Sequence, residues 1–408
     1  MNPYPQHLEE AIEWLSKFGK EKDDGVTRLV FSRAWNEAQH ALKDWMETLG
    51  LLVSFDSVGN LFGRLPAREE DAPTILVGSH VDTVRSGGKY DGAYGILAAL
   101  LAVAALKKEY GAPKLNLEVV SLCEEEGSRF PLACLGSGLM TGLYESRDLK
   151  GLTDSEGMKL EDAMKMSGFS LPGGEYTVRT DIDAFIEIHI EQGPALEKLR
   201  KQIGIVQAIV GQKRYQVTVT GEYNHAGTAS MHWRKDALMG AAEMICALYE
   251  SMGNREDQLV ATVGQLFVKP NIPNVIPGRV VFSVDARHPS EETLESFCRQ
   301  FSRQFLEISA DRGLGTEIKM CHEVHPVQMN QALIETVQDI CVKREISYQL
   351  MNSGAGHDSQ LFAKVYPTAL LFVPSQGGIS HSPLEYTPVK DLETGLDVLK
   401  ECLHQLAY

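Results

Sequence analysis

Paired cysteines are missing from this sequence. Its 408 residues include seven cysteines, none in a Cys-x-x-Cys arrangement, at positions 123, 134, 246, 298, 321, 341 and 402. A disulfide framework or a cysteine-based zinc site shows regular spacing or short paired motifs. The odd number and irregular spacing therefore predict reduced thiols and a cytoplasmic protein. Three glutamates follow Cys123 and disfavour a thiolate there, so this residue is not expected to be a nucleophile.

An excess of positive charge and a long apolar run are also missing. Lysine and arginine number 39 against 55 aspartates and glutamates, which gives a formal net charge of −16. This balance argues against nucleic acid or an anionic membrane as a partner, although one arginine or a metal still permits a small anionic substrate. No apolar run reaches the roughly 20 residues of a membrane span. Near the start, Leu8, Ile12, Leu15 and Phe18 have helical spacing, which predicts an amphipathic helix rather than a signal peptide.

The length and the pattern of the chain predict two domains. Hydrophobic residues make up 43% of the sequence, and 408 residues exceed one average domain. Strands alternate with helices up to about residue 209, which is typical of an α/β sandwich. Beyond it, strands alternate polar and apolar residues as in a half-exposed antiparallel sheet, and the α/β pattern returns after Pro326. We therefore expect an α/β domain of residues 1–209 and 327–408, interrupted by a smaller α+β domain of residues 210–326.

The chain is organised around the stretch from Gly78 to Gly95. The apolar run Thr74–Val77 predicts a buried strand, and His80, Asp82 and Asp91 follow in a glycine-rich loop that leads into a helix. In an open α/β sheet, ligands bind at the carboxyl ends of the strands. Imidazole and carboxylates in one loop suit zinc, manganese or a similar ion. They equally suit a turn and a helix cap with a surface histidine, so this stretch alone leaves both interpretations open.

Three further elements follow apolar strands and supply the same side-chain types. Glu124, Glu125 and Glu126 end one strand, where packed like charges would raise one pKa or need a cation. His189 projects from a strand beside two glutamates, and His381 lies in a glycine-rich loop. Each alone is more typical of a structural residue or a solvated loop. Together with His80 and Asp91, they supply enough ligands for two ions if one carboxylate bridges them, the arrangement of two-metal hydrolases.

These motifs resemble the M20 family of metal-dependent amidohydrolases and peptidases. Within that family they are similar to the branch of allantoate deiminases and N-carbamoyl-L-amino-acid hydrolases, over essentially the whole chain. The motifs are Gly-Ser-His-Val-Asp-Thr, Glu-Glu-Glu-Gly-Ser-Arg-Phe, His-Ile-Glu-Gln-Gly, Asn-His-Ala-Gly-Thr, Asn-Val-Ile-Pro-Gly, Ser-Gly-Ala-Gly-His-Asp and Gly-Ile-Ser-His-Ser-Pro. The resemblance implies a zinc-peptidase-like catalytic domain with an inserted lid, which in the family also forms the dimer contact.

The resemblance also assigns the metal ligands. It implies that His80, Asp91 and His189 hold one ion, and that Asp91, Glu126 and His381 hold a second, with Asp91 bridging the two. Zinc and manganese both suit this mixture of ligands. Glu125 would be the general base, and Asp82 would orient His80 and set its tautomer.

The substrate residues implied by the resemblance are Gln192, His225, Asn274 and Arg287. An arginine can bind a carboxylate through two hydrogen bonds, and His225 and Asn274 can donate to a developing oxyanion. In the family, a histidine at the position of His225 reaches the active site from the partner subunit. Without the resemblance, Arg287 suits a surface ion pair, His225 a loop that faces solvent, and Asn274 a turn. Gly354 is expected to bring its backbone close to the ligand. In the loop after His225, Ser230 stands where a proline is common in the family that the chain resembles.

The implied reaction is the removal of a carbamoyl group from allantoate by a cytoplasmic homodimer. Water would attack a ureido carbonyl with Glu125 as base, yielding ureidoglycine, ammonia and carbon dioxide. The alternative function is hydrolysis of N-carbamoyl-L-amino acids. A dipeptidase or aminoacylase of the same family is a weaker alternative. A metal-binding module without catalysis is a further alternative. The presence of Glu125 argues against that module, because binding a metal does not require this carboxylate.

Overall fold

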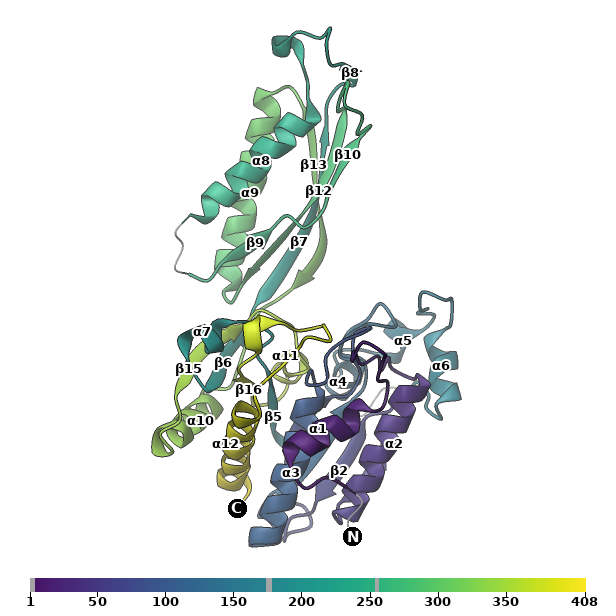
Figure 1. Cartoon of the computed structure of the whole chain (residues 1–408), viewed down its shortest axis with the longest axis vertical. Coiled ribbons are helices and arrows are strands. Elements are labelled where there is room, and N and C mark those ends of the chain that lie inside the picture. The colour runs from purple at the N-terminus through teal and green to yellow at the C-terminus, as the bar shows by residue number, and fades with distance from the viewer. Residues whose placement is uncertain (1–3, 174–177, 254–256) are drawn as a thin grey trace. The chain divides into compact units, whose positions relative to one another are not determined.

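A computed structural model describes residues 4–173, 178–253 and 257–408. The chain forms two compact units, labelled by their elements in Figure 1. The larger unit comprises Met1–Gln207 and Gln328–Tyr408, and the smaller unit comprises Ala208–Val327. The helices of the described residues include none that combines the length and the apolar character needed to cross a membrane.

The larger unit is built on a mixed sheet, for which the described residues provide nine strands. In spatial order they are β1 (Leu52–Phe55), β2 (Leu61–Leu65), β4 (Asn116–Leu122), β3 (Thr74–His80), β5 (Ile182–Ile190), β16 (Thr368–Val373), β6 (Ile203–Ile209) and β14 (Val327–Gln328), with β15 (Tyr348–Ser353) beside β6. The four strands β4, β3, β5 and β16 are parallel neighbours, and antiparallel pairs flank them. The loops that follow these four strands therefore converge at one edge of the sheet.

Helices cover both faces of this sheet, which confirms the predicted α/β class. The helices are α1 (Leu8–Ser16), α2 (Arg33–Thr48), α3 (Ala93–Tyr110), α4 (Leu135–Met140), α5 (Ser146–Leu149), α6 (Leu160–Met166), α7 (Ala195–Leu199), α10 (Gln331–Lys343), α11 (Ser359–Phe362), α12 (Val389–Ala407) and the 3₁₀ turn η2 (Gln376–Gly378). Phe185 of β5 stacks on Phe362 of α11, with ring centroids 4.0 Å apart. Ile188 lies against Gly395 of α12 on the opposite face, because successive strand residues alternate.

The smaller unit is a two-layer α+β structure. Its antiparallel sheet has the order β10 (Leu266–Lys269), β12 (Arg279–His288), β7 (Gly211–Thr220) and β13 (Gly315–Val324), with β9 (Val260–Thr262) beside β12. Helices α8 (Ala237–Met252) and α9 (Glu291–Asp311) pack on one face, where Val219, Phe282 and Phe305 belong to a buried apolar cluster. A separate ribbon pairs β8 (Asn224–His225) with β11 (Val275–Ile276), and η1 (Met231–Trp233) is a 3₁₀ turn.

The structure differs from the elements that the sequence predicts in several places. The alternating residues 259–268 predict one strand, but the structure has two, β9 and β10. In the irregular segment between them, the Gln265 amide donates to the Ser283 hydroxyl and the Gln265 carbonyl accepts the Ser283 amide. Strands β6, β15 and β13 were not expected. Alternation along a strand predicts Glu187, His189 and Glu191 on one face. Glu191 instead lies beyond β5 and accepts the Ala195 and Leu196 amides at the start of α7.

Candidate metal centre

The candidate ligands lie where the four parallel strands end. His80 is the last residue of β3 and His189 is the second-last residue of β5, while Glu126 follows β4 and His381 follows β16. Asp91 reaches the same edge through the loop that leads into α3. That loop turns at Gly92, where φ is 63° and a Cβ would come within 2.4 Å of the His80 carbonyl oxygen. Glycine is therefore required for the loop to fold back onto the strand end.

The Asp91 carboxylate lies between two groups of side chains. Its Oδ1 is 3.4 Å from His80 Nε2 and 3.1 Å from His189 Nε2, and its Oδ2 is 3.2 Å from His381 Nε2. Glu126 Oε2 is 3.6 Å from the same His381 nitrogen. Two sets of potential ligand atoms result, each within 4.8 Å of one another, namely His80–Asp91–His189 and Asp91–Glu126–His381. One carboxylate with an oxygen toward each set is the arrangement required of a bridging ligand.

The buried histidines present their Nε2 atoms to Asp91. His80 Nδ1 is 2.9 Å from the Asp82 carbonyl oxygen, and His189 Nδ1 is 2.9 Å from the Ile190 carbonyl oxygen. Because a carbonyl only accepts, each Nδ1 carries a proton and donates it. A neutral ring then has its lone pair on Nε2, as a metal ligand needs. The Gly92 amide donates to His189 Nε2 at 3.0 Å, which agrees with that tautomer.

The carboxylates of the site are crowded and incompletely paired. Glu126 Oε1 is buried and has no hydrogen-bond partner among the described residues. Burial, together with the Asp91 charge, raises the pKa of Glu126 to about 7. Burial also raises the pKa of Asp91, but the imidazoles of His189, His381 and His80, which face its carboxylate, outweigh burial and hold that pKa well below its ordinary value. Oxygen and imidazole donors around an unpartnered carboxylate oxygen fit a divalent cation.

Glu125 lies beside this cluster without belonging to either set of ligand atoms. Its Oε2 is 3.8 Å from His80 Nε2, and its side chain is only 12% exposed. Burial raises the pKa of Glu125 well above its ordinary value, with the Glu126 charge adding to the effect. A carboxylate in this state takes up a proton readily, as a general base must.

Asp82 contacts His80 through its backbone carbonyl. Its side-chain Oδ1 is 3.9 Å from His80 Nδ1, whereas its backbone carbonyl is the acceptor at 2.9 Å. The carboxylate instead accepts the amides of Glu125 at 3.3 Å and Glu126 at 3.1 Å. Asp82 is thus positioned to hold both His80 and the loop of glutamates.

Gln192 and Gly354 are the predicted substrate residues of the larger unit. Gln192 Nε2 donates to Asp91 Oδ2 at 2.8 Å and to Ser380 Oγ at 3.2 Å, so its side chain lies in contact with a candidate ligand. Gly354 directly follows β15, and a Cβ there would meet no described atom within 4 Å. Protein packing therefore does not explain the glycine at that position.

His225, Asn274 and Arg287 all lie in the smaller unit. The ribbon β8–β11 pairs His225 with Val275, and the Ala226 amide donates to the Asn274 carbonyl at 3.0 Å, which brings His225 and Asn274 together. Arg287 Nε donates to Asp285 Oδ1 at 2.9 Å, so the ion pair expected of a surface arginine is present.

Arg234 braces the loop that follows His225, and sequence reasoning missed it. Its guanidinium donates to the Ala229 carbonyl at 3.0 Å and to the Ala226 carbonyl. Ser230 directly precedes the η1 turn within this loop. No spacing in the sequence distinguishes Arg234 from an ordinary surface arginine.

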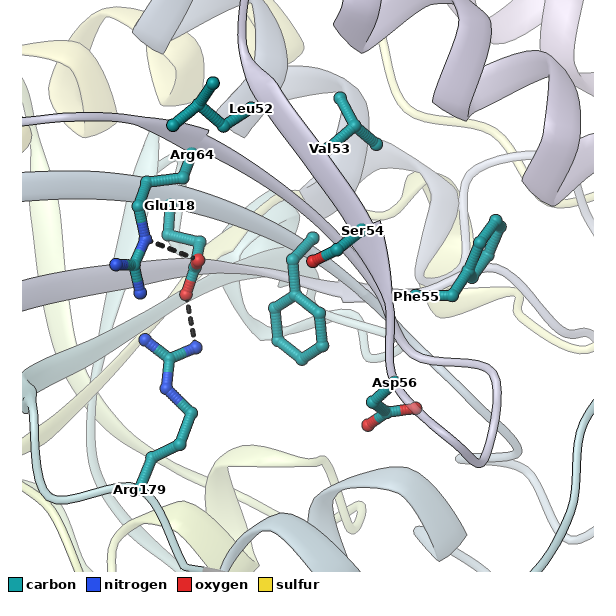
Figure 2. A pocket seen from close by; sticks show the side chains of 9 residues that line it. Leu52, Val53, Ser54, Phe55, Asp56, Arg64, Glu118 and Arg179 are labelled. Atoms are coloured by element: carbon teal, nitrogen blue, oxygen red, sulfur yellow. Dashed lines mark hydrogen bonds and ion pairs between the residues drawn. The ribbon is translucent and has the colours of Figure 1, made fainter.

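A pocket of about 330 Å³ lies away from these residues, at the β1 edge of the sheet. Figure 2 shows Glu118 between two arginines; its carboxylate accepts from Arg64 Nε at 2.9 Å and also from Arg179. Asp181 pairs with the same two arginines, so the two positive and two negative charges balance. None of the described residues that line the pocket is a predicted site residue.

A third group of possible ligand atoms, in the smaller unit, already contains a cation. Glu291, Glu323 and His325 have donor atoms within 4.8 Å of one another. The Lys213 ammonium is 2.8 Å from carboxylate oxygens of both glutamates. It therefore supplies the positive charge that a metal ion would otherwise bring to these carboxylates.

The comparisons with known proteins place this chain in one family. The pattern of Peptidase family M20/M25/M40 matches residues 76–405. The chain belongs to this family of metal-dependent hydrolases, which confirms the resemblance seen in the sequence.

Relatives at high coverage define the branch of the family. The chain is 47% identical to an allantoate amidohydrolase of Bacillus subtilis (strain 168), over 98% of this chain and 97% of that protein. It is 36% identical to an N-carbamoyl-L-amino-acid amidohydrolase of Paenarthrobacter aurescens, over 98% of each chain. A crystal structure of an amidase of the hydantoinase/carbamoylase family from Burkholderia multivorans superposes with a TM-score of 0.93 at 33% identity, over 98% of this chain and 97% of that one. The relatives are amidohydrolases, so the chain is a hydrolase of carbon–nitrogen bonds other than peptide bonds.

Proposed function

We propose that this protein is an allantoate amidohydrolase that holds two divalent ions, manganese or zinc. Allantoate and water would give ureidoglycine, ammonia and carbon dioxide. The observation that carries the proposal is the Asp91 carboxylate, which turns one oxygen toward His80 and His189 and the other toward His381. The 47% identity to an allantoate amidohydrolase supports the choice of substrate.

The bound ions would supply Lewis acidity and lower the pKa of a water molecule. His80, Asp91 and His189 would hold one ion, and Asp91, Glu126 and His381 the other. Glu125 would take the proton of the attacking water and return it to the leaving nitrogen. Its burial and the 3.8 Å from its Oε2 to His80 Nε2 support that role. Asp82 would fix the position of His80 through its carbonyl and the positions of the Glu125 and Glu126 amides through its carboxylate.

The substrate would be bound by the remaining predicted residues. Arg287 would bind the carboxylate of allantoate, and His225 and Asn274 would donate to the developing oxyanion. Gln192 would contact the ureido group from its position beside Asp91, and the backbone at Gly354 would approach the ligand closely. Before Arg287 can do this, its pair with Asp285 must loosen or be shared with the substrate.

We further propose that the smaller unit is the lid and the homodimer contact, in a cytoplasmic protein. It exposes large apolar side chains, with 72% of Met231, 78% of Trp233 and 60% of Phe267 accessible in the single chain. Side chains of this kind are typical of protein interfaces. Light scattering at micromolar concentration should give twice the chain mass, and Trp233→Asp should shift it to one chain mass. A wild-type monomer with full activity would contradict the dimer.

The function is tested by ammonia release from allantoate and from a panel of N-carbamoyl-L-amino acids, measured side by side with the manganese-loaded protein. A preference for allantoate that chelation abolishes supports the proposal. A preference for a carbamoyl amino acid supports the second candidate, which the 36% identity to such an amidohydrolase favours. Two bound ions without turnover of any substrate would favour a non-catalytic binding module.

A further inference from the structure

Glu385 is a buried carboxylate that no part of the proposed reaction uses. It stands four residues after His381 and is only 4% exposed. Its Oε1 accepts the backbone amides of Tyr90 at 3.0 Å and Asp91 at 3.1 Å. Its Oε2 accepts the Ser380 hydroxyl at 2.7 Å. Both oxygens of one side chain are therefore engaged by the two loops that carry Asp91 and His381.

The contacts extend from Glu385 to the candidate ligands themselves. Ser380 precedes His381, and its hydroxyl oxygen is also 3.4 Å from Asp91 Oδ2. His381 has a φ of 54°, a conformation that is strained for a side chain with a Cβ and needs support from its surroundings. Glu385 supplies that support through the neighbouring Ser380 and through the turn in which its own amide donates to the Ser382 carbonyl at 3.0 Å.

The Asp91 loop is shaped to receive this side chain. At Gly88, a Cβ would come within 2.1 Å of Glu385 Oε1 and within 2.6 Å of Glu385 Cβ. Any larger residue at position 88 would therefore collide with Glu385. The close approach joins segments 294 residues apart in sequence, since that is the separation of Asp91 and Glu385.

We propose that Glu385 is a positioning residue that holds the Asp91 loop and the His381 loop at the spacing at which both ligands reach the same ion. This inference rests on the two-ion function proposed above. Removing the carboxylate frees two buried amides and the Ser380 hydroxyl, so the loops separate. The ion of Asp91, Glu126 and His381 is affected most, because His381 lies on a loop with a half-exposed side chain, whereas His80 and His189 are buried on core strands.

The test is a manganese titration of the metal-stripped full chain, followed by electron paramagnetic resonance and by the stoichiometry of bound ion. The wild type should bind two ions and show the signal of a coupled pair. In Glu385→Ala the second ion should bind about 10- to 100-fold more weakly, as is common when a hydrogen-bond partner of a metal ligand is removed. The coupled signal should be replaced by that of a single ion.

Two further variants keep the result interpretable. Glu385→Gln retains one carbonyl oxygen for the Tyr90 and Asp91 amides but reverses the bond to Ser380, so its loss should be smaller, about 3- to 10-fold. It also serves if Glu385→Ala fails to fold. The matched control is Glu118→Gln, which removes the charge of another buried carboxylate, one that pairs with Arg64 and Arg179 away from the ligands. It should keep two ions and the coupled signal.

Unchanged binding of both ions in Glu385→Ala and Glu385→Gln would overturn the positioning role and leave the two-ion proposal intact. An equal loss of ions in Glu385→Gln and Glu118→Gln, with an equal fall in melting temperature, would also overturn it, because it would reduce Glu385 to general stability. A wild-type chain that binds neither manganese nor zinc would refute the two-ion function itself, and the inference with it.

Discussion

Asp358 is a buried carboxyl group whose replacement should reduce the loss of stability that accompanies a rise in pH toward neutral. Its side chain is fully buried, and the Ser137 hydroxyl donates to Oδ1 while Oδ2 has no partner among the described residues. Burial raises the pKa of Asp358 to about 8, and the Glu187 charge adds to the effect. In the unfolded chain the same group has a pKa of about 3.9. Between these values the folded chain holds a proton that the unfolded chain releases.

The sign and the size of the effect follow from this difference. Stability falls with rising pH wherever the folded state binds more protons, and one proton corresponds to about 1.36 kcal/mol per pH unit. Between pH 5.5 and 7.5 the Asp358 carboxyl should therefore remove about 2.5 kcal/mol from the free energy of unfolding. Asp358→Asn keeps an oxygen for the Ser137 hydroxyl and cannot ionise. As the pH rises from 5.5 to 7.5, the free energy of unfolding of the variant should therefore increase by about 2.5 kcal/mol relative to that of the wild type.

The assay is urea unfolding of metal-free wild type and Asp358→Asn at pH 5.5, 6.5 and 7.5, followed by tryptophan fluorescence. The signal reports mainly on the larger unit, because Trp35 and Trp45 are fully buried there whereas Trp233 of the smaller unit is 78% exposed. The control is Asp339→Asn, which changes an exposed carboxylate on α10. Parallel stability curves for wild type and Asp358→Asn would refute the argument, as would a variant that loses stability relative to the wild type as the pH rises.

Three predictions concern activity. Glu125→Gln should lower kcat for allantoate by roughly 10²- to 10⁴-fold while two ions still bind, because only the proton acceptor is lost; an unchanged rate would remove Glu125 from the mechanism. Chelation should abolish ammonia release, and added manganese or zinc should restore it, since the ions supply the Lewis acidity; full activity in the stripped protein would contradict a metal hydrolase. Arg234→Ala removes the donors to the Ala226 and Ala229 carbonyls and loosens the His225 loop. It should raise KM about 10-fold, roughly 1.4 kcal/mol, with little change in melting temperature; an unaltered KM would show that substrate binding does not need this brace.

The α/β class and the grouping of candidate ligands could be predicted from local sequence. Short apolar runs mark the buried strands, and His80, Glu126, His189 and His381 each lie at or just after the end of one. Parallel neighbouring strands bring such ends to one edge, so the pattern along the chain predicts proximity in space. The sequence motifs supported the family for the same reason, because most of them are strand ends or loops that follow strands.

The orientation of the groups was decided only by the tertiary structure. The sequence does not reveal that Asp91 divides its two oxygens between the two ligand sets, or that Asp82 contacts His80 through its carbonyl. The strands β6 and β15, which the sequence did not predict, pair with each other across more than a hundred residues. No short connecting turn in the sequence therefore indicates their pairing.

Glu385 is the clearest case of this limit. Its contacts with the Tyr90 and Asp91 amides join positions almost three hundred residues apart, and the motif Gly-Ile-Ser-His-Ser-Pro ends before it. A hydrogen bond depends on distance and direction between two atoms, and neither is encoded in spacing along the chain once the partners lie on different elements. The sequence by itself determined which side chains are available at the edge of the sheet, and packing of the whole unit decided which atoms meet there.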